Sequence, residues 1–262
     1  MNKRFTSGVA LAAVLTIIGS GAVLAHEGDE NPLALTPLSA SDFGVLPNTA
    51  TVDGQPITSW IEKYDDWFQQ TPGGEHYFST GECQGGQGGP VFFLGNVSFG
   101  TTQVFDCTIE PGQNILLSPG FGFGFDDETG DSLEVVYDTG LDNAMMLFNP
   151  KLIIDGRPVP FGGSTWFDRG AYTMDLVEGN LFGAPAGAYN AASNGWYMML
   201  EPLESGKHTI IMSDEILRPV ISTDDVDGDT RVVVEDPHGV GETITATAVF
   251  NITVPDLEAA AE

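Results

Sequence analysis

Residues 244–254 alternate between apolar and polar side chains. The apolar set and the polar set fall on opposite faces of an extended chain, and only Val249 breaks the pattern: Ile244, Ala246, Ala248, Phe250, Ile252 and Val254 against Thr245, Thr247, Asn251 and Thr253. Period-two alternation is typical of a strand with one buried face. Helical burial would instead repeat every three or four residues. This stretch therefore predicts a long strand in a sheet that has one face packed on a core.

Short apolar runs separated by turns fill most of the chain before this strand. They lie at residues 91–94, 104–109, 114–117, 152–154, 196–200 and 208–212. Asp155 and Gly156 stand between two apolar runs, and this pair favours a two-residue hairpin because both residues tolerate positive φ. The pattern predicts a mainly β fold, a single β-sandwich of the immunoglobulin-like or jelly-roll-like kind.

One N-terminal amphipathic helix is predicted to begin near Pro56, a residue suited to a first helical turn. Apolar side chains then recur at helical spacing, with charged side chains on the other side: Ile57, Trp60, Ile61, Tyr64, Trp67 and Phe68 against Glu62, Lys63, Asp65 and Asp66. We interpret the aromatic stripe as a core face rather than a ligand platform. Residues 131–148 fit either a short helix or another hairpin.

The first 25 residues resemble a signal peptide. Lys3 and Arg4 precede a short apolar run, and residues 23–25 (Val-Leu-Ala) fit a cleavage site. The expected organisation is a signal peptide at 1–25, an acidic flexible leader at 26–50, a β-sandwich domain at 51–255 and a tail at 256–262. No second long apolar run follows, so no membrane insertion is expected after cleavage, and the protein is expected in the periplasm or outside the cell.

The chain is strongly acidic, with 37 Asp and Glu against nine Lys and Arg. Loss of residues 1–25 removes Lys3 and Arg4 but no acid, so the net charge moves from −28 to −30. Such a surface repels nucleic acid and anionic lipid, because both are polyanions. It suits divalent cations and high salt, and a halophilic or marine habitat is a hypothesis that follows.

Cys83 and Cys107 are the two cysteines of the chain. An exported chain meets an oxidising compartment, where a disulfide is the default. The alternative is a pair of reduced, buried thiols.

Residues 224–229 read Asp-Asp-Val-Asp-Gly-Asp and form a candidate calcium site. Hard cations take several oxygen ligands from a flexible loop. The proposed ligands are Asp225, Asp227, Asp229 and Asp236. The Gly falls at the wrong position for an EF-hand, and a solvated acidic turn is the alternative interpretation. Residues 126–131 hold a second, weaker candidate.

Three other chemistries have weaker support. Cleavage after Ala25 would expose His26 as a terminal copper ligand with His76 or His208, but a mobile leader follows it. A Gly-x-Ser-x-Gly nucleophile motif is absent, so His208 is read as a structural histidine. Phenylalanines alternating with glycines at 121–125 form either an aromatic strip for a flat ligand or a core strand under a helix, and we favour the core strand.

Several segments resemble an uncharacterised family of exported bacterial and archaeal proteins. The similar segments are the spaced Trp60 and Trp67, the Cys-containing stretches at 80–95 and 107–112, the hairpin at 154–156, and residues 194–197 and 202–210. The likeness covers most of residues 57–255 and implies one domain with a Cys83–Cys107 pair. It implies no site residues and no activity.

The function predicted from the sequence is a non-enzymatic exported protein for binding or for the cell envelope. The alternatives are a secreted enzyme acting on polysaccharide or another polymer, and a calcium-stabilised interaction module. Calcium is the one candidate cofactor, and a divalent cation or a polysaccharide is a candidate partner. The oligomeric state is not predicted.

Overall fold

The computed structural model describes residues 38–256, apart from 84–86, 96, 98, 99, 127–131, 146, 161, 163, 164, 218, 219, 227, 228 and 236–242. For residues 217, 220–226 and 229–235, and for Phe78 and Phe148, it describes the backbone only. The described residues belong to one compact unit, Leu38–Glu262.

The fold is mainly β, and its largest sheet has five strands. Their order across the sheet is β4 (Thr102–Thr108), β13 (Thr243–Val254), β10 (Gly206–Leu217), β6 (Leu147–Ile154) and β7 (Arg157–Pro158). All neighbours are antiparallel except β13 and β4, which run parallel. The long strand predicted from the alternation at 244–254 is β13, and its even-numbered residues from Ala246 to Val254 are buried.

A second sheet has four strands, in the order β3 (Val91–Leu94), β5 (Asn114–Phe125), β9 (Gly187–Leu200) and β8 (Trp166–Leu176). Two small two-stranded sheets pair β1 (Thr51–Val52) with β2 (Gln55–Pro56) and β11 (Val220–Val226) with β12 (Asp229–Glu235). The chain passes from one large sheet to the other at β4, β5, β6, β8 and β10, so residues distant in sequence become neighbours in space.

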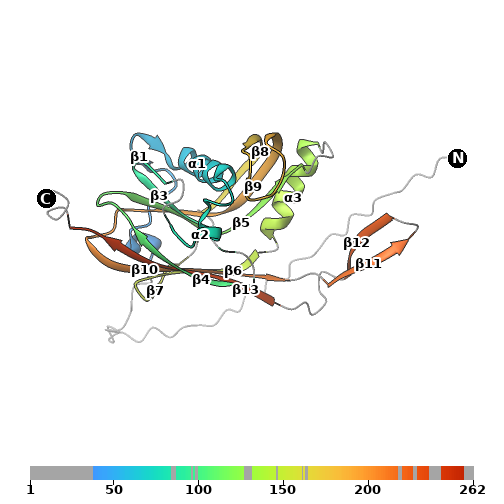
Figure 1. Ribbon diagram of the computed structural model, residues 1–262. Coiled ribbons are helices and arrows are strands. Elements are labelled where there is room, and N and C mark those ends of the chain that lie inside the picture. The colour runs from blue at the N-terminus through green and yellow to red at the C-terminus, as the bar shows by residue number, and fades with distance from the viewer. Residues whose placement is uncertain are drawn as a thin grey trace, which may run out of the picture. The chain divides into compact units, whose positions relative to one another are not determined.

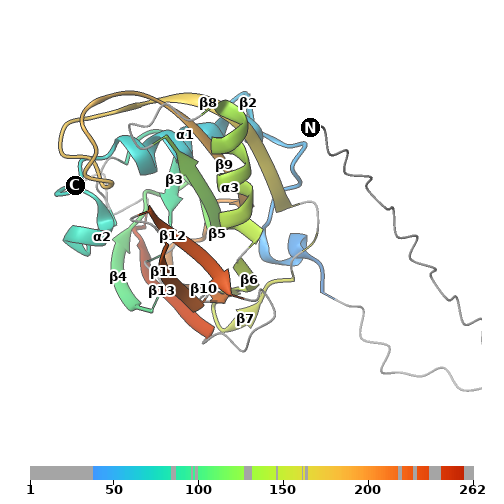
Figure 2. The same cartoon turned by 90° about the vertical axis from the view of Figure 1, so that its right-hand side faces the viewer.

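The four-stranded sheet lies above the five-stranded sheet in Figure 1, and Figure 2 shows the same order. One hydrophobic core joins them, with side chains from β4, β13 and β10 below and from β3, β5 and β9 above. Phe105 and Phe250 stack there with ring centroids 5.0 Å apart. Alternate residues are buried in β13 of the five-stranded sheet, whereas β3 and much of β5 and β9 are buried at consecutive residues, since α1 covers the second face of their sheet.

Helix α1 (Ile57–Gln70) covers the upper face of the four-stranded sheet, the face turned away from the other sheet (Figure 1). Tyr64 and Phe68 of α1 contact Phe121 of β5 edge-to-face, so the aromatic stripe is a core face. Two shorter helical elements, η1 (Ala40–Phe43) and α2 (Tyr77–Thr80), flank α1 in the sequence.

Helix α3 (Leu133–Met145) occupies the segment that the sequence left open between a helix and a hairpin. It packs directly on the glycine face of β5, where a Cβ added to Gly122 would lie 2.0 Å from the backbone nitrogen of Ala144. The same face of β5, at Gly120, approaches Leu147 and Asp214 of the five-stranded sheet. Helix α3 therefore extends the layer of the five-stranded sheet, and the phenylalanines of β5 point to the opposite side.

Two local predictions are confirmed. Asp155 and Gly156 turn the chain between β6 and β7, with φ of 49° and 75°. Cys83 and Cys107 form a disulfide with their Cα atoms 5.3 Å apart. Among the described residues, no helix has the length and apolar character needed to cross a membrane.

The second half of the predicted leader packs on the core. Val45 is buried and pairs with Leu200 at the end of β9, and the amide of Leu46 donates to the carbonyl of Met199 at 2.8 Å. Residues 45 and 46 are thus held at the C-terminal end of β9. The acidic, Pro-rich composition of the segment did not predict this contact.

Candidate functional site

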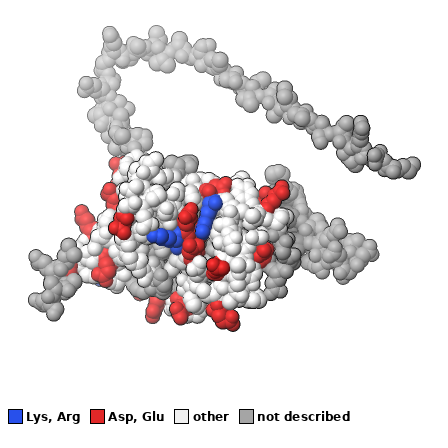
Figure 3. Space-filling model, turned by 90° about the horizontal axis from the view of Figure 1, so that it is seen from above, with Lys and Arg blue, Asp and Glu red and all other residues white. Residues whose placement is uncertain are grey.

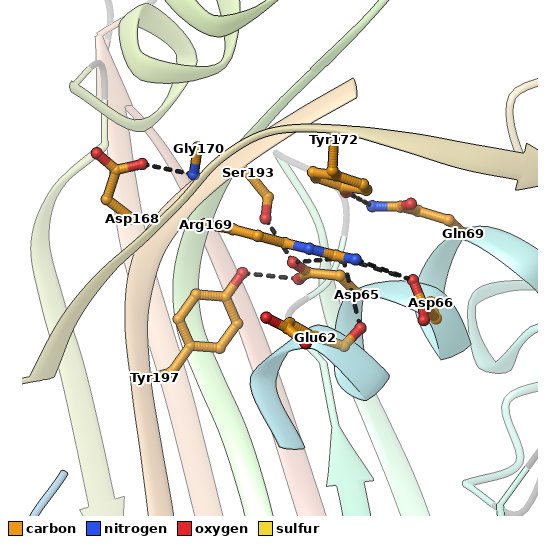
Figure 4. A network of polar contacts seen from close by, with 10 residues as sticks. All are labelled: Glu62, Asp65, Asp66, Gln69, Asp168, Arg169, Gly170, Tyr172, Ser193 and Tyr197. Carbon is orange, nitrogen blue, oxygen red and sulfur yellow. Dashed lines mark hydrogen bonds and ion pairs between the residues drawn. The ribbon is translucent and has the colours of Figure 1, made fainter. Parts of the chain in front are cut away.

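A buried carboxylate, Asp65, lies at the centre of the most extensive polar network among the described residues (Figure 4). Asp65 is on α1 and its exposed fraction is 0%. The prediction that Asp65 lies on the charged side of the helix is wrong. Asp65 follows Ile61 by four residues and precedes Phe68 by three, so it shares their buried face.

Two hydroxyl groups from β9 donate to this carboxylate. Ser193 Oγ reaches Asp65 Oδ2, and Tyr197 Oη lies 2.9 Å from Asp65 Oδ1. Residues 193 and 197 are four apart on a strand, so their side chains point to the same face of the sheet, the face under α1. The alternation of β9 therefore positions both donors.

Arg169 of β8 supplies the positive charge of the network. Its Nη1 lies 3.3 Å from Asp65 Oδ2, and its Nη2 lies 3.4 Å from Asp66 Oδ1. The guanidinium stacks on the ring of Tyr172, 3.5 Å from the centroid, and the hydroxyl of Tyr172 accepts a hydrogen bond from Gln69. Figure 4 shows the guanidinium lying between α1 and β8.

The ionisation of Asp65 is governed by burial. Burial raises the pKa of Asp65 from 3.8 to about 6, although Ser193, Arg169 and Tyr197 all lower it. Burial also lowers the pKa of Arg169, but Tyr172, Asp65 and Asp66 outweigh it and hold that pKa above its usual value. The carboxylate therefore ionises less readily than a surface Asp, while the guanidinium stays charged.

This network is suited to holding α1 on the sheet. Ser193 and Tyr197 donate to the Asp65 carboxylate and lie beneath the helix, so neither hydroxyl faces a substrate. A general base must lie within hydrogen-bond distance of the substrate proton that it removes, and Asp65 is enclosed by its own partners. Both oxygens of the Asp65 carboxylate are hydrogen-bonded, although Gln69 Oε1 at the margin of the network has no hydrogen-bond partner among the described residues. A buried polar group with its partners in place rigidifies the fold and specifies a single packing arrangement. We accordingly assign the Asp65 network a structural role.

A second polar cluster lies where the β6–β7 hairpin meets β10. His208 Nδ1 is 2.8 Å from Asp155 Oδ2, and His208 Nε2 is 2.9 Å from the carbonyl oxygen of Glu204. Burial lowers the pKa of His208, but its bonds to Asp155 and to the Glu204 carbonyl outweigh burial and raise it. Both ring nitrogens are occupied, which fits the interpretation of His208 as a structural histidine.

Hollows lie on either side of His208. One, of about 370 Å³, is bounded by Phe43, Arg157 and Glu201. The other, of about 470 Å³, is bounded by Asp106, Lys207 and Asn251 and opens on the five-stranded sheet. Their hydrogen-bonding side chains can contact a polar ligand. Cys107 lines the larger hollow beside His208, but its sulfur is bonded to Cys83.

The lower face of the five-stranded sheet, here called the open face, carries the side chains that alternate with the core. No described helix or sheet lies against it in Figure 1. On this face one residue of each strand lies directly opposite one residue of the next strand. These five residues are apolar and are here called the apolar row: Val104, Val249, Ile211, Ile153 and Pro158. Val104 is 60% exposed, and the others are half-buried or exposed.

Polar rows flank the apolar row on both sides. Asn251 lies one row away and donates to Asp106 at 3.0 Å. Thr247 lies one row away on the other side, where its hydroxyl is 3.3 Å from that of Ser213. Lys151 pairs there with Glu215 at 3.2 Å. The open face thus has an apolar centre and a polar surround.

Positive charge is unevenly distributed over the described side chains. Lys151, Arg157 and Lys207 lie on strands of the five-stranded sheet, and Lys63 and Arg169 lie near α1. On the face shown in Figure 3, which carries α1, the blue side chains gather at the centre and acids surround them. Elsewhere acids dominate a chain of net charge −28, so the open face is closer to neutral than most of the surface.

The predicted metal site stays a prediction, although β11 and β12 pair so that the backbones of Asp225 and Asp229 lie on neighbouring strands. Asp227 and Asp236 lie outside the described residues, and of Asp225 and Asp229 only the backbone is described, on β11 and β12. Across the described part of the chain, no three His, Cys, Asp or Glu side chains form a metal-binding group. His26 also lies outside the described residues, and His76 is buried.

Sequence reasoning missed both the Asp65 network and the apolar row. A charged residue on the apolar spacing of α1 was the available signal for the network. For the row the only signal was Val249, the apolar residue that breaks the alternation of β13, because the other members come from other strands and only the register aligns them. Comparison with protein-family models, with curated proteins and with solved structures finds no match for the chain.

Proposed function

We propose that the chain is an exported, non-enzymatic protein of the cell envelope that binds a partner through the open face. In this proposal the two large sheets form a β-sandwich of the immunoglobulin-like or jelly-roll-like kind, preceded by a cleaved signal peptide. The apolar row carries the proposal. Soluble monomers rarely expose a large contiguous apolar patch, and such a patch with a rim of polar residues marks an interaction site.

The polar groups of the described residues support binding over catalysis. The carboxylate with the most perturbed pKa, Asp65, is held beneath α1 by its own partners. His208 of β10, which is partly buried, has both ring nitrogens engaged. An active site usually combines a pocket with a perturbed titratable group that is free to react. His208 lines both hollows, but its ring nitrogens are taken up by Asp155 and the Glu204 carbonyl. The acidic surface further favours a partner that is not a polyanion.

Co-sedimentation tests the proposal. The protein isolated from the cells that produce it is mixed with the insoluble envelope of those cells, and the bound fraction is measured for the native chain and for Ile211→Lys. We expect the native chain to sediment and the variant to lose at least tenfold in binding, because a charge at the centre of the row would need to be desolvated.

Val135→Lys is the matched control, because Val135 is an exposed apolar residue on α3, 48% exposed and away from the open face. It should sediment like the native chain. Native protein that stays in the supernatant, or equal sedimentation of Ile211→Lys, would refute the proposal.

A further inference from the structure

We infer that the open face binds a second copy of this chain, with the twofold axis lying parallel to the apolar row. This inference rests on the open face being the binding surface. A face-to-face dimer of sheets needs a surface that is complementary to itself, since a twofold axis brings the same patch together from both copies. The register of the five strands provides a direct test of that requirement.

The apolar row would meet its own copy along the axis. Ile211 is at the centre of the row, on the central strand β10, and would face Ile211 of the second copy. Val249 and Ile153 lie beside it on β13 and β6. Aliphatic side chains from two sheets pack together at a separation of about 10 Å. The row would thereby form a continuous apolar centre with polar rows as its rim, which is the usual anatomy of an interface.

The charges are arranged about the row so that opposite signs meet. Rotation about the row exchanges positions above it with positions equally far below it. On β10, Lys207 precedes Ile211 by four residues and Glu215 follows it by four. Each copy would therefore place Lys207 opposite Glu215 of the other.

The remaining acid on this face meets a neutral residue. Asp106 lies two residues after Val104 on β4, and Thr102 lies two residues before it, so the rotation pairs Asp106 with Thr102. No like-charge pair forms among the described side chains. Complementary charges of this kind fix the orientation of partners and suppress wrong arrangements.

The alternative axis, parallel to the strands, is disfavoured. A rotation about β10 would leave each of its residues facing itself, so Lys207 would oppose Lys207 and Glu215 would oppose Glu215. Like charges placed opposite each other are destabilising. The charge pattern of a single strand thus distinguishes the two ways in which the sheets could pair.

The area of the open face fits a reversible dimer. Four inter-strand spacings of about 4.8 Å and eight residue steps of about 3.4 Å give a footprint of roughly 500 Å² per copy. Specific interfaces average about 800 Å² per partner, and weak ones lie below about 600 Å² per partner. We therefore expect assembly to depend on protein concentration.

A second copy fits the row better than a glycan does. The row is made only of aliphatic side chains, whereas sugar rings are usually held on aromatic faces, and the self-complementary charges have no counterpart on a neutral polymer. A glycan would also leave Lys207 and Glu215, which stand at opposite ends of the face, without a reason for their symmetric spacing.

Sedimentation velocity of the full chain tests the dimer, at protein concentrations from about 1 µM to about 200 µM, the range that resolves weak association. The native chain and Val135→Lys should change from monomer to dimer. Ile211→Lys should remain a monomer. Lys207→Glu and Glu215→Lys should each weaken the dimer several-fold, and the double variant should recover it, because the exchanged charges pair again.

Disulfide trapping tests the axis. The only native cysteines, Cys83 and Cys107, are already paired, so a new cysteine reacts alone. Ile211→Cys should form a covalent dimer on oxidation. A mixture of Lys207→Cys with Glu215→Cys should cross-link at least fivefold more than either variant alone. Self-linking of Lys207→Cys at the rate of the mixture would refute this axis.

The outcome separates this inference from the proposed function. A native chain that stays monomeric at every concentration while it still sediments with the envelope through the open face refutes the dimer and keeps the binding role. A native chain that neither dimerises nor sediments with the envelope refutes both the dimer and the binding role. A dimer that persists in Ile211→Lys overturns the inference, since the row would then not be its interface.

Discussion

The face of the four-stranded sheet under α1 and the open face of the five-stranded sheet use polar side chains in opposite ways. Under α1, an acid, a base and two hydroxyl groups are sealed from water and bonded to each other. On the open face, charged side chains stay at the surface around an apolar centre. Two sheets that share one core thus differ in whether their outer polar groups are desolvated.

The difference has consequences for stability. A buried ion pair has a large desolvation cost, and removal of one partner leaves the charge of the other partner buried and uncompensated. A surface pair contributes little, because water and salt screen it. Substitutions under α1 should therefore alter the free energy of unfolding, whereas those on the open face should alter association.

Arg169→Met should produce the largest loss of stability. It removes the positive partner of Asp65, whose side chain is fully buried, and leaves that carboxylate uncompensated. We expect a loss of about 3 kcal/mol, which corresponds to a fall in Tm of about 6–12 °C for a domain of this size. Thermal unfolding followed by circular dichroism measures it.

Lys151→Met is the matched control on the open face. It removes a cation from a pair of similar length, Lys151 with Glu215 at 3.2 Å, but with half of the lysine side chain exposed. Its stability should change by less than about 0.5 kcal/mol. Equal losses in the two variants would show that burial does not distinguish the two faces.

The second effect is a dependence of stability on pH that arises from Asp65. Its pKa is raised from 3.8 to about 6 in the folded chain. Between these values the folded chain holds a proton that the unfolded chain has released, so stability falls as pH rises from about 4 to about 6. The shift corresponds to about 3 kcal/mol, since each pKa unit is about 1.4 kcal/mol.

Asp65→Asn isolates this contribution from the other carboxylates. Urea unfolding at a series of pH values gives the free energy of unfolding for both chains. The native chain should lose stability relative to Asp65→Asn as pH rises from 4 to 7, and the difference should be constant above that. A difference that does not vary with pH would mean that Asp65 titrates as it does in the unfolded chain.

Local patterns predicted the elements, and distant pairings determined the sites. The alternation along β13, the Asp155-Gly156 turn and the aromatic spacing of α1 could each be read from consecutive residues. The pairing of Cys83 with Cys107 could be predicted because the chain has two cysteines and is expected in an oxidising compartment. Helix α3 could not be decided, because its residues fit a hairpin as well, and it lies on Gly122 of a strand that was itself recognised only in part.

The partners of Asp65 lie more than 100 residues away, on β8 and β9. No local pattern reports them, and the carboxylate was therefore assigned to the solvent side. The apolar row needs five strands in a single register, of which β4 is joined to β13 by a parallel pairing across most of the chain. A one-residue slip in any strand would turn its member of the row inward.

The smallest effect concerns the His208–Asp155 pair, which lies at the rim of the open face with Asp155 about half exposed. The pKa of His208 is raised above 6.5, so its charged form contributes stability below that pH, and the contribution is lost as pH rises through the folded pKa. Asp155→Asn should lower that pKa toward 6.5, measured by NMR titration of the ring, and cost less than about 1 kcal/mol at pH 6. An unchanged His208 pKa would assign the shift to the Glu204 carbonyl instead.

Because the pair is near the surface, salt should also lower the His208 pKa, whereas the titration of Asp65, enclosed beneath α1, should respond much less.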